Sequence, residues 1–211
     1  MNKVLILVGL FFCATLSAQD FPSQVWHYGH IVLIEGDTLT GQIRYNQETD
    51  VVEYMMPDMK TAIALTGQKI LYAQIFDNIT RQYRDFFALP YALNGDYETP
   101  ILFEVLIEGK PLTLLSRERL EFRVVNSPYA GASYSRMEIV FTYFFLRENG
   151  EIEPFNGNKK QLLWLMRDKS SEVKKFIKSN RLRTERRSDL IKLVYYYNNL
   201  FSHTHTSADN G

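Results

Sequence analysis

The stretch GHIVLIEGDTLTGQIRY, residues 29–45, decides the fold of this chain. Its second half alternates apolar and polar side chains, which is the pattern of a strand with one buried and one solvated face. The apolar residues of the buried parity are Leu39, Ile43 and Tyr45. Residues 31–34 are apolar at every position, so we expect a strand covered on both faces. Residues 35–38, Glu-Gly-Asp-Thr, form a turn between the two, and the stretch predicts a β-hairpin.

The same strand pattern recurs along the chain as far as Phe155. Further strands are predicted at residues 51–56, 61–65, 70–77, 81–89, 101–108, 112–117, 120–125, 137–147 and 152–155. In the strand 101–108, the alternation places Ile101 and Phe103 toward the core and Glu104 on the other side. Residues 126–135 hold too many small and turn-forming residues for a regular element, and Asn149-Gly150 predicts a type I′ hairpin turn.

After Phe155 the apolar residues recur with the period of a helix. One helix is expected at 159–167, a second capped by Asp168 or Ser170, and a third capped by Ser188. Strands followed by helices predict an α+β fold, largely antiparallel, with about ten strands in a sandwich or incomplete barrel and a C-terminal cap of three helices. We expect a single domain over 19–201, β-rich over 26–155 and helical over 158–201, with a disordered tail at 202–211.

The first eighteen residues form a predicted signal peptide. Lys3 gives a positive start, residues 4–12 are apolar, and small residues follow up to Ala18, where cleavage is expected. The apolar run is too short to remain in a bilayer, and no later stretch approaches about 20 apolar residues. We therefore expect an exported protein without a transmembrane span after signal removal, located in the periplasm, at the outer membrane or in the medium.

The only cysteine, Cys13, lies within the predicted signal peptide. Lipid attachment at Cys13 is the alternative, but Phe12 occupies the position where a small residue normally precedes such a cysteine. Cleavage at Ala18 would leave a chain without disulfides, a cysteine nucleophile or cysteine metal ligands. Basic and acidic residues number 24 each, and this zero net charge gives no electrostatic reason to expect a nucleic-acid partner.

The pattern G-x-I-x-L-x-x-G-D-T-L-x-G-x-I at residues 29–43 resembles exported, uncharacterised proteins of Bacteroidota-type bacteria. The C-terminal part is similar too, with its Asn-Gly hairpin, its Lys-rich helix and the ending DLIKLVYYYNNL at residues 189–200. The resemblance implies an envelope or secreted setting. It implies no activity, substrate or catalytic residue.

No motif in the sequence predicts a catalytic, cofactor or metal site. Asp37 is expected to serve the hairpin turn, and His27 and His30 would point to opposite faces of a strand. His203 and His205 lie in the predicted tail. Ser127, Ser133 and Ser135 lack the Gly-x-Ser-x-Gly surroundings of a nucleophile. Carboxylate pairs for glycoside hydrolysis can be drawn from Asp85, Asp96, Glu98 and Glu104, but their spacing alone does not bring any two together.

Two stretches are candidates for contact with a partner. A basic cluster on the second and third helices would meet an acidic envelope component or partner protein, or form a solvated outer face. Its members are Lys174, Lys175, Lys178, Arg181, Arg183, Arg186 and Arg187. Tyr129 and Tyr134, among small residues, suit contacts with sugars or another chain. We therefore expect a non-catalytic, envelope-associated binding or structural protein, with a small exported hydrolase as the alternative.

Overall fold

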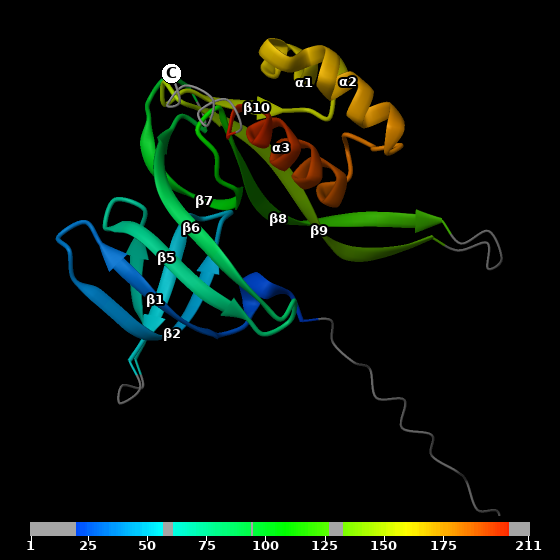
Figure 1. Ribbon diagram of the computed structural model, residues 1–211. Coiled ribbons are helices and arrows are strands. Elements are labelled where there is room, and N and C mark those ends of the chain that lie inside the picture. Colours follow the sequence, from blue (N-terminus) through cyan, green and yellow to red (C-terminus); the bar gives the residue numbers. More distant parts are fainter. Residues whose placement is uncertain (1–19, 57–60, 94, 127–132, 203–211) are drawn as a thin grey trace, which may run out of the picture.

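The computed structural model describes residues 20–56, 61–93, 95–126 and 133–202 (Figure 1). Within these residues, ten antiparallel strands form one sheet that does not close on itself, and three α-helices follow. This confirms the predicted α+β fold with a C-terminal helical cap. The strand order is β10-β9-β8-β7-β6-β5-β1-β2-β3-β4.

The elements have the following bounds. The strands are β1 (His27–Leu33), β2 (Thr38–Asn46), β3 (Val51–Met55), β4 (Ile63–Thr66), β5 (Ile70–Asp77), β6 (Gln82–Tyr91), β7 (Thr99–Ile107), β8 (Leu112–Asn126), β9 (Ser133–Arg147) and β10 (Ile152–Phe155). The helices are α1 (Lys159–Leu165), α2 (Ser170–Ser179) and α3 (Arg187–Ser202), with 3₁₀ turns at Pro22–Gln24 and Arg167–Lys169. None of the described helices is both long and apolar enough to cross a membrane.

The hairpin predicted at residues 29–45 is β1 and β2, and its turn depends on one glycine. The N–H of Gly36 donates to the carbonyl of Leu33 (3.0 Å), and the N–H of Leu33 donates to the carbonyl of Asp37 (2.8 Å). Gly36 has a φ of +97°, which completes a type I turn with a bulge. The alternation of β2 is as predicted, whereas the expected double cover of 31–34 is wrong at Ile34, which is exposed in the turn.

The N-terminal half of the sheet curls strongly. Strands β4 and β5 lie four positions apart in the strand order, yet only residues 67–69 connect them, so the sheet must bend to bring their ends together. The concave side of this curl holds a core of Ile31, Ile43, Tyr45, Val52, Tyr54, Ile70, Ala73, Ile75, Phe86 and Leu102.

The helices cover the C-terminal half of the sheet and bury a second core (Figure 1). Leu114 and Phe145 contribute from the sheet. The helical cap contributes Leu162, Leu165, Met166, Val173, Ile177, Leu190, Leu193, Val194 and Tyr197. A third, smaller core contains Ile101, Phe103, Leu115 and Phe144. Leu114 and Leu115 are neighbours on β8, so the second and third cores lie on opposite faces of the sheet.

Several local predictions were wrong. The strands expected at 112–117 and 120–125 are one strand, β8, and β9 includes Ser133–Ser135, which were expected to be irregular. The turn at Asn149-Gly150 is not type I′. The N–H of Gly150 donates to the carbonyl of Arg147 (3.0 Å), and only Gly150 has a positive φ, so it repeats the bulged turn of the first hairpin.

The helix ends also differ in part from the expected ones. Asn158 caps α1, because its side chain accepts a hydrogen bond from the N–H of Lys160 (2.8 Å). Neither Asp168 nor Ser170 donates or accepts a capping bond at α2, which follows Lys169. Ser188 lies inside α3 rather than before it, and α3 includes Ser202, the first residue of the predicted tail. The signal peptide and the rest of the tail lie outside the described residues.

Candidate functional site

A closed network of charged side chains joins the two halves of the sheet at Arg84 on β6. Its guanidinium donates to both carboxylate oxygens of Glu104 (3.0 and 2.9 Å), to Glu118 (2.8 Å) and to Asp77 (3.1 Å). Tyr45 contacts Arg84 through its hydroxyl and donates that hydroxyl's proton to Glu118 (2.9 Å). The side chain of Arg84 is only 3% exposed, so the network is shut off from solvent.

The ionisation of this network follows from its pairing. Burial alone would raise the pKa of Glu104, but the guanidinium groups of Arg84 and Arg187 lower that pKa below its ordinary value. Burial likewise opposes ionisation of Asp77, and backbone N–H groups of the next turn together with Arg84 lower its pKa. Burial raises the pKa of Tyr45 well above 10, so its phenol remains a donor. Glu104 and Asp77 are therefore held as anions, not as acids.

Arg187 connects this network to the helical cap. At the first position of α3, it donates to Glu104 (2.9 Å) and to the hydroxyl of Ser116 (3.2 Å), which in turn donates to Glu104 (3.0 Å). Its guanidinium also lies 4.7 Å from the ring centre of Phe141. Arg187 was predicted within the exposed basic cluster, whereas the structure places it half-buried against β7 and β8.

The carboxylates considered for glycoside hydrolysis do not converge. Glu104, expected on the wet side of its strand, is buried on Arg84. Asp85 neighbours Arg84 on β6 and therefore points to the other face of the sheet. Asp96 and Glu98 are exposed in the β6–β7 connection.

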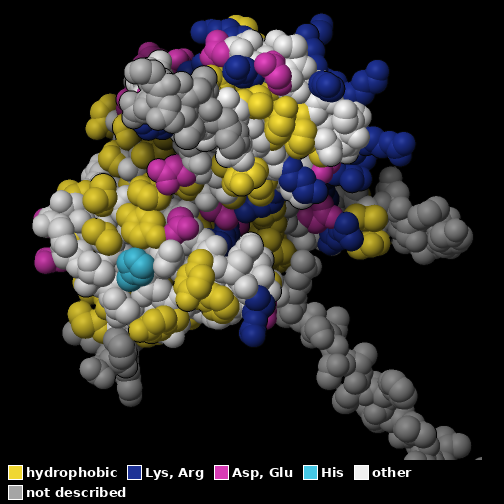
Figure 2. Space-filling view, viewed as in Figure 1, with side chains coloured by type: hydrophobic (Ala, Val, Ile, Leu, Met, Phe, Trp, Pro, Cys, Tyr) yellow, Lys and Arg dark blue, Asp and Glu magenta, His cyan; other side chains and the backbone are white. Residues whose placement is uncertain are grey.

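An open groove lies between the sheet and α3, and we call it the α3 groove. It comprises two adjoining hollows of about 710 and 620 Å³ that share Ile107, Glu108 and Tyr195. The first hollow is lined by Tyr72, Gln74, Asp85, Phe87, Val105, Leu106, Ile107, Glu108 and Tyr195. Figure 2 shows hydrophobic side chains spread over this face of the molecule, with a few acidic ones among them.

The polar groups of the α3 groove converge on Asp85. Its carboxylate accepts hydrogen bonds from the hydroxyl of Tyr72 (2.5 Å) and from the amide of Gln74 (2.8 Å). Burial, followed by the hydrogen bond to Asp85, raises the pKa of Tyr72 well above its ordinary value, so the phenol stays protonated. The ring of Tyr72 packs against Phe87, with 4.8 Å between the ring centres, and Tyr195 is 60% exposed on the facing helix.

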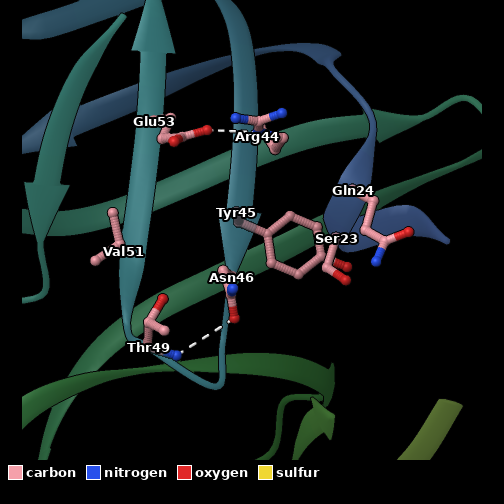
Figure 3. A pocket seen from close by; sticks show the side chains of 8 residues that line it. All are labelled: Ser23, Gln24, Arg44, Tyr45, Asn46, Thr49, Val51 and Glu53. Carbon is pink, nitrogen blue, oxygen red and sulfur yellow. Dashed lines mark hydrogen bonds and ion pairs between the residues drawn. The ribbon is translucent and has the colours of Figure 1, made fainter. Parts of the chain in front are cut away.

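A smaller hollow, separate from the α3 groove, lies beside β2 and the N-terminal 3₁₀ turn (Figure 3). It encloses about 260 Å³ and is lined by Ser23, Gln24, Arg44, Tyr45, Asn46, Thr49, Val51 and Glu53. Its two charged side chains, Arg44 and Glu53, pair with each other. The side chain of Asn46 accepts a hydrogen bond from the N–H of Thr49 (3.3 Å). Compared with the α3 groove, this hollow offers a ligand fewer unpaired charges and less aromatic surface for stacking.

Six of the seven predicted basic residues are exposed at one end of the helical cap, and we call them the basic face. They are Lys174, Lys175, Lys178, Arg181, Arg183 and Arg186. Dark-blue side chains gather at that end of the molecule in Figure 2. Within the described residues, only Arg183 of this set forms an ion pair, with Glu185 (2.9 Å).

The remaining candidates have local partners or lie outside the described part. His27 is buried, with its Nε2 2.7 Å from the carbonyl of Pro22, whereas His30 packs against Tyr72. No group of three metal-ligating side chains occurs among the residues that the structure describes. Tyr134 is on β9 rather than in a loop and is half exposed, and Tyr129 lies outside the described residues.

Comparison of the chain with protein-family models, curated proteins and solved structures gives no match. The resemblance of residues 29–43 to exported Bacteroidota-type proteins therefore stays a prediction. Sequence reasoning also missed the α3 groove, because its walls come from β5, β6, β7 and α3, which are distant in sequence. The one available signal was the pair of aromatic residues on neighbouring strands, Tyr72 and Phe87.

Proposed function

We propose that this chain is an exported, non-catalytic binding protein of the cell envelope and that its ligand is a glycan bound in the α3 groove. The observation that supports this proposal is an open groove in which aromatic rings surround a hydrogen-bonding cluster. Aromatic faces stack on the C–H faces of sugar rings, and carboxylate and amide groups bind sugar hydroxyls. The groove combines both kinds of group in Tyr72, Tyr195, Asp85 and Gln74.

The alternative, a small exported hydrolase, needs two carboxylates with divided roles on either side of the scissile bond. Asp85 and Glu108 line the first hollow of the groove, and Glu148 and Asp168 line the second. Asp85 already accepts two hydrogen bonds, from Tyr72 and Gln74, an arrangement that suits an anion which orients a ligand. The buried carboxylates on Arg84 are closed to solvent and cannot reach a substrate.

Calorimetric titration with cello-, malto- and chito-oligosaccharides tests the glycan proposal. We expect saturable binding by at least one of them and a loss of about fivefold or more in affinity for Tyr195→Ala, because stacking on an aromatic ring contributes about 1 kcal/mol. Tyr83→Ala is the matched control, because Tyr83 is similarly exposed (68%) and does not line the groove. Binding that is unaffected by Tyr195→Ala would contradict a site in this groove.

The basic face is a candidate for a second contact surface. Its six cations have one ion pair among the described residues, so most of their charge is available to a partner. We propose that it holds the protein against an acidic component of the envelope. The chemistry required is a surface rich in phosphate or carboxylate groups, which interacts with exposed Lys and Arg over about a Debye length.

A further inference from the structure

Strands β8 and β9 extend beyond the rest of the sheet. They pair without a register shift from Leu112 and Arg147 to Asn126 and Ser133. Their outer neighbours stop early, because the β7 pairing ends at Ser116 and the β10 pairing ends at Tyr143. Beyond the buried residues Arg117 and Glu118, both strands continue as a two-stranded arm that projects from the body (Figure 1). We call residues 119–126 and 133–140 the β8–β9 arm.

This arm has features that isolated ribbons in monomers usually avoid. One of its faces is apolar, with Phe122 74% exposed and Val124 67% exposed beside Met137 and Ile139. An isolated two-stranded ribbon is only marginally stable in water, and a long, regular, unpaired edge invites another strand. The pairing contains no bulge that would twist the edge away.

The backbone groups available at the outer edge of β9 follow from the hairpin with β10. The N–H of Arg147 bonds toward the carbonyl of Glu151, on the β10 side. Alternate residues of a strand bond to the same side, so Met137 and Ile139 also direct their N–H and C=O groups to that side. Among the described residues, no strand pairs with β9 there.

The charges on this edge match a second copy of the same edge. We propose that two copies of this chain pair antiparallel through β9, with Met137 of each copy on the two-fold axis. This register places Arg136 opposite Glu138 of the other copy, twice by symmetry, and Ser135 opposite Ile139. If the two-fold axis instead passes through residue 136 or 138, Arg136 lies opposite Arg136 or Glu138 opposite Glu138 of the other copy. Like charges directly opposite each other are unfavourable.

The arm itself supplies no cross-strand partner of opposite charge directly opposite these residues. Across the β8–β9 ladder, Glu138 is opposite Glu121, and Arg136 is opposite Arg123. Their present ion pairs are along β9 and diagonal, with Arg136 to Glu138 on the same strand and Arg123 to Glu138 at 3.4 Å. Arg136 and Glu138 therefore gain a partner of opposite charge directly across a ladder only when the second copy pairs.

Cysteine cross-linking tests the register in a Cys13→Ser background, which removes the only native cysteine. Met137→Cys should form a disulfide-linked dimer, because the Cα atoms of such a pair lie about 5.5 Å apart. Ser135→Cys and Ile139→Cys should not cross-link alone, since four residues of strand separate like positions by about 13 Å. A mixture of the Ser135→Cys and Ile139→Cys chains should cross-link. Cross-linking of Ser135→Cys with itself, or failure of Met137→Cys, would overturn this register.

Charge exchange tests the pairing without cysteine. Arg136→Glu or Glu138→Arg alone should weaken dimerisation about tenfold or more in sedimentation experiments, because two opposite-charge pairs become like-charge pairs. The double exchange should restore it, and it also places opposite charges across the β8–β9 ladder. Exchanging Lys159 and Lys160, which are exposed at the start of α1 and outside the arm, for Glu is the control and should leave dimerisation unchanged. A monomer at all concentrations, or a dimer that cross-links through Phe122→Cys on β8 instead, would overturn the proposal.

Discussion

Replacing Arg84 with Met tests whether the buried network holds the two halves of the sheet together. The substitution preserves much of the side-chain volume but leaves Asp77, Glu104 and Glu118 without their shared cation. Removing one partner of a buried ion pair costs about 3–5 kcal/mol, because the remaining charge stays desolvated. This is a large part of the roughly 5–15 kcal/mol that stabilises a typical domain, so we expect a folded but much weakened protein.

Urea denaturation followed by circular dichroism measures this loss. With a slope of about 2 kcal/mol per molar urea, the midpoint should fall by about 2 M. Arg44→Met is the matched control, because its ion pair with Glu53 is about one third exposed and such pairs contribute about 0–1 kcal/mol. A midpoint shift for Arg84→Met no larger than that of Arg44→Met would refute the role assigned to the network.

The pH dependence of the Arg84→Met variant provides an independent check. Without the guanidinium, desolvation raises the pKa values of the buried carboxylates. A group with a raised folded-state pKa contributes stability that is present at low pH and is lost as the pH rises through that value. The variant's deficit should therefore shrink between pH 7 and pH 4. A deficit that grows on acidification would contradict this explanation.

Three further predictions follow from the structure. In the native chain the pKa of Glu104 is lowered, so its contribution to stability should be lost as the pH falls below about 4.5. Glu104→Gln should therefore reduce the loss of stability on acidification, and an unchanged loss would argue against this role of Glu104. Gly36→Ala should lower the free energy of unfolding by about 1 kcal/mol and the melting temperature by roughly 2–4 °C, because the turn requires a positive φ at this residue. An unchanged melting temperature in calorimetry would exclude this strain. Replacing Lys174, Lys175 and Lys178 of the basic face with Glu should abolish sedimentation of the protein with anionic vesicles at low salt, whereas replacing Lys159 and Lys160 with Glu should not. An equal loss in both variants would show only a general effect of net charge.

The strands and helices could be predicted because each follows from a local pattern. Period-two alternation located β2, and the change to the helical period after Phe155 located the cap. Turn chemistry was only partly accessible. Gly36 and Gly150 were both identified as turn residues, but the type I′ turn predicted at Asn149-Gly150 was wrong, because the number of residues in the loop selects the bulged turn.

The buried network could not be predicted, because its charges come from positions far apart in the sequence. The alternation placed Phe103 on the buried face of its strand and Glu104 on the other face, which was expected to be solvated. In the curled sheet that second face is covered too, and Glu104 is buried. The partners of Glu104, Arg84 and Arg187, lie on β6 and α3. The break predicted between strands 112–117 and 120–125 is also wrong, and there Arg117 pairs with Asp50 and Glu118 with Arg84, two residues far away in the sequence.

The α3 groove and the basic face differ in how far sequence could define them. The basic face is a local cluster, so its residues were recognisable, and only Arg187 required the structure to assign it to the buried network. The groove needs β5, β6, β7 and α3 to be assembled before Tyr72 and Tyr195 line the same hollow. Both surfaces were therefore described fully only once the fold was known.

The most direct test of the binding proposal is an NMR titration of the labelled protein with the oligosaccharide that binds best. We predict saturable shifts of the amides around Tyr72, Asp85 and Tyr195, with the anomeric proton signals of the sugar unchanged over a day. Shifts confined to other parts of the molecule, or new anomeric signals from a cleaved sugar, would contradict a non-catalytic binding protein with its site in the α3 groove.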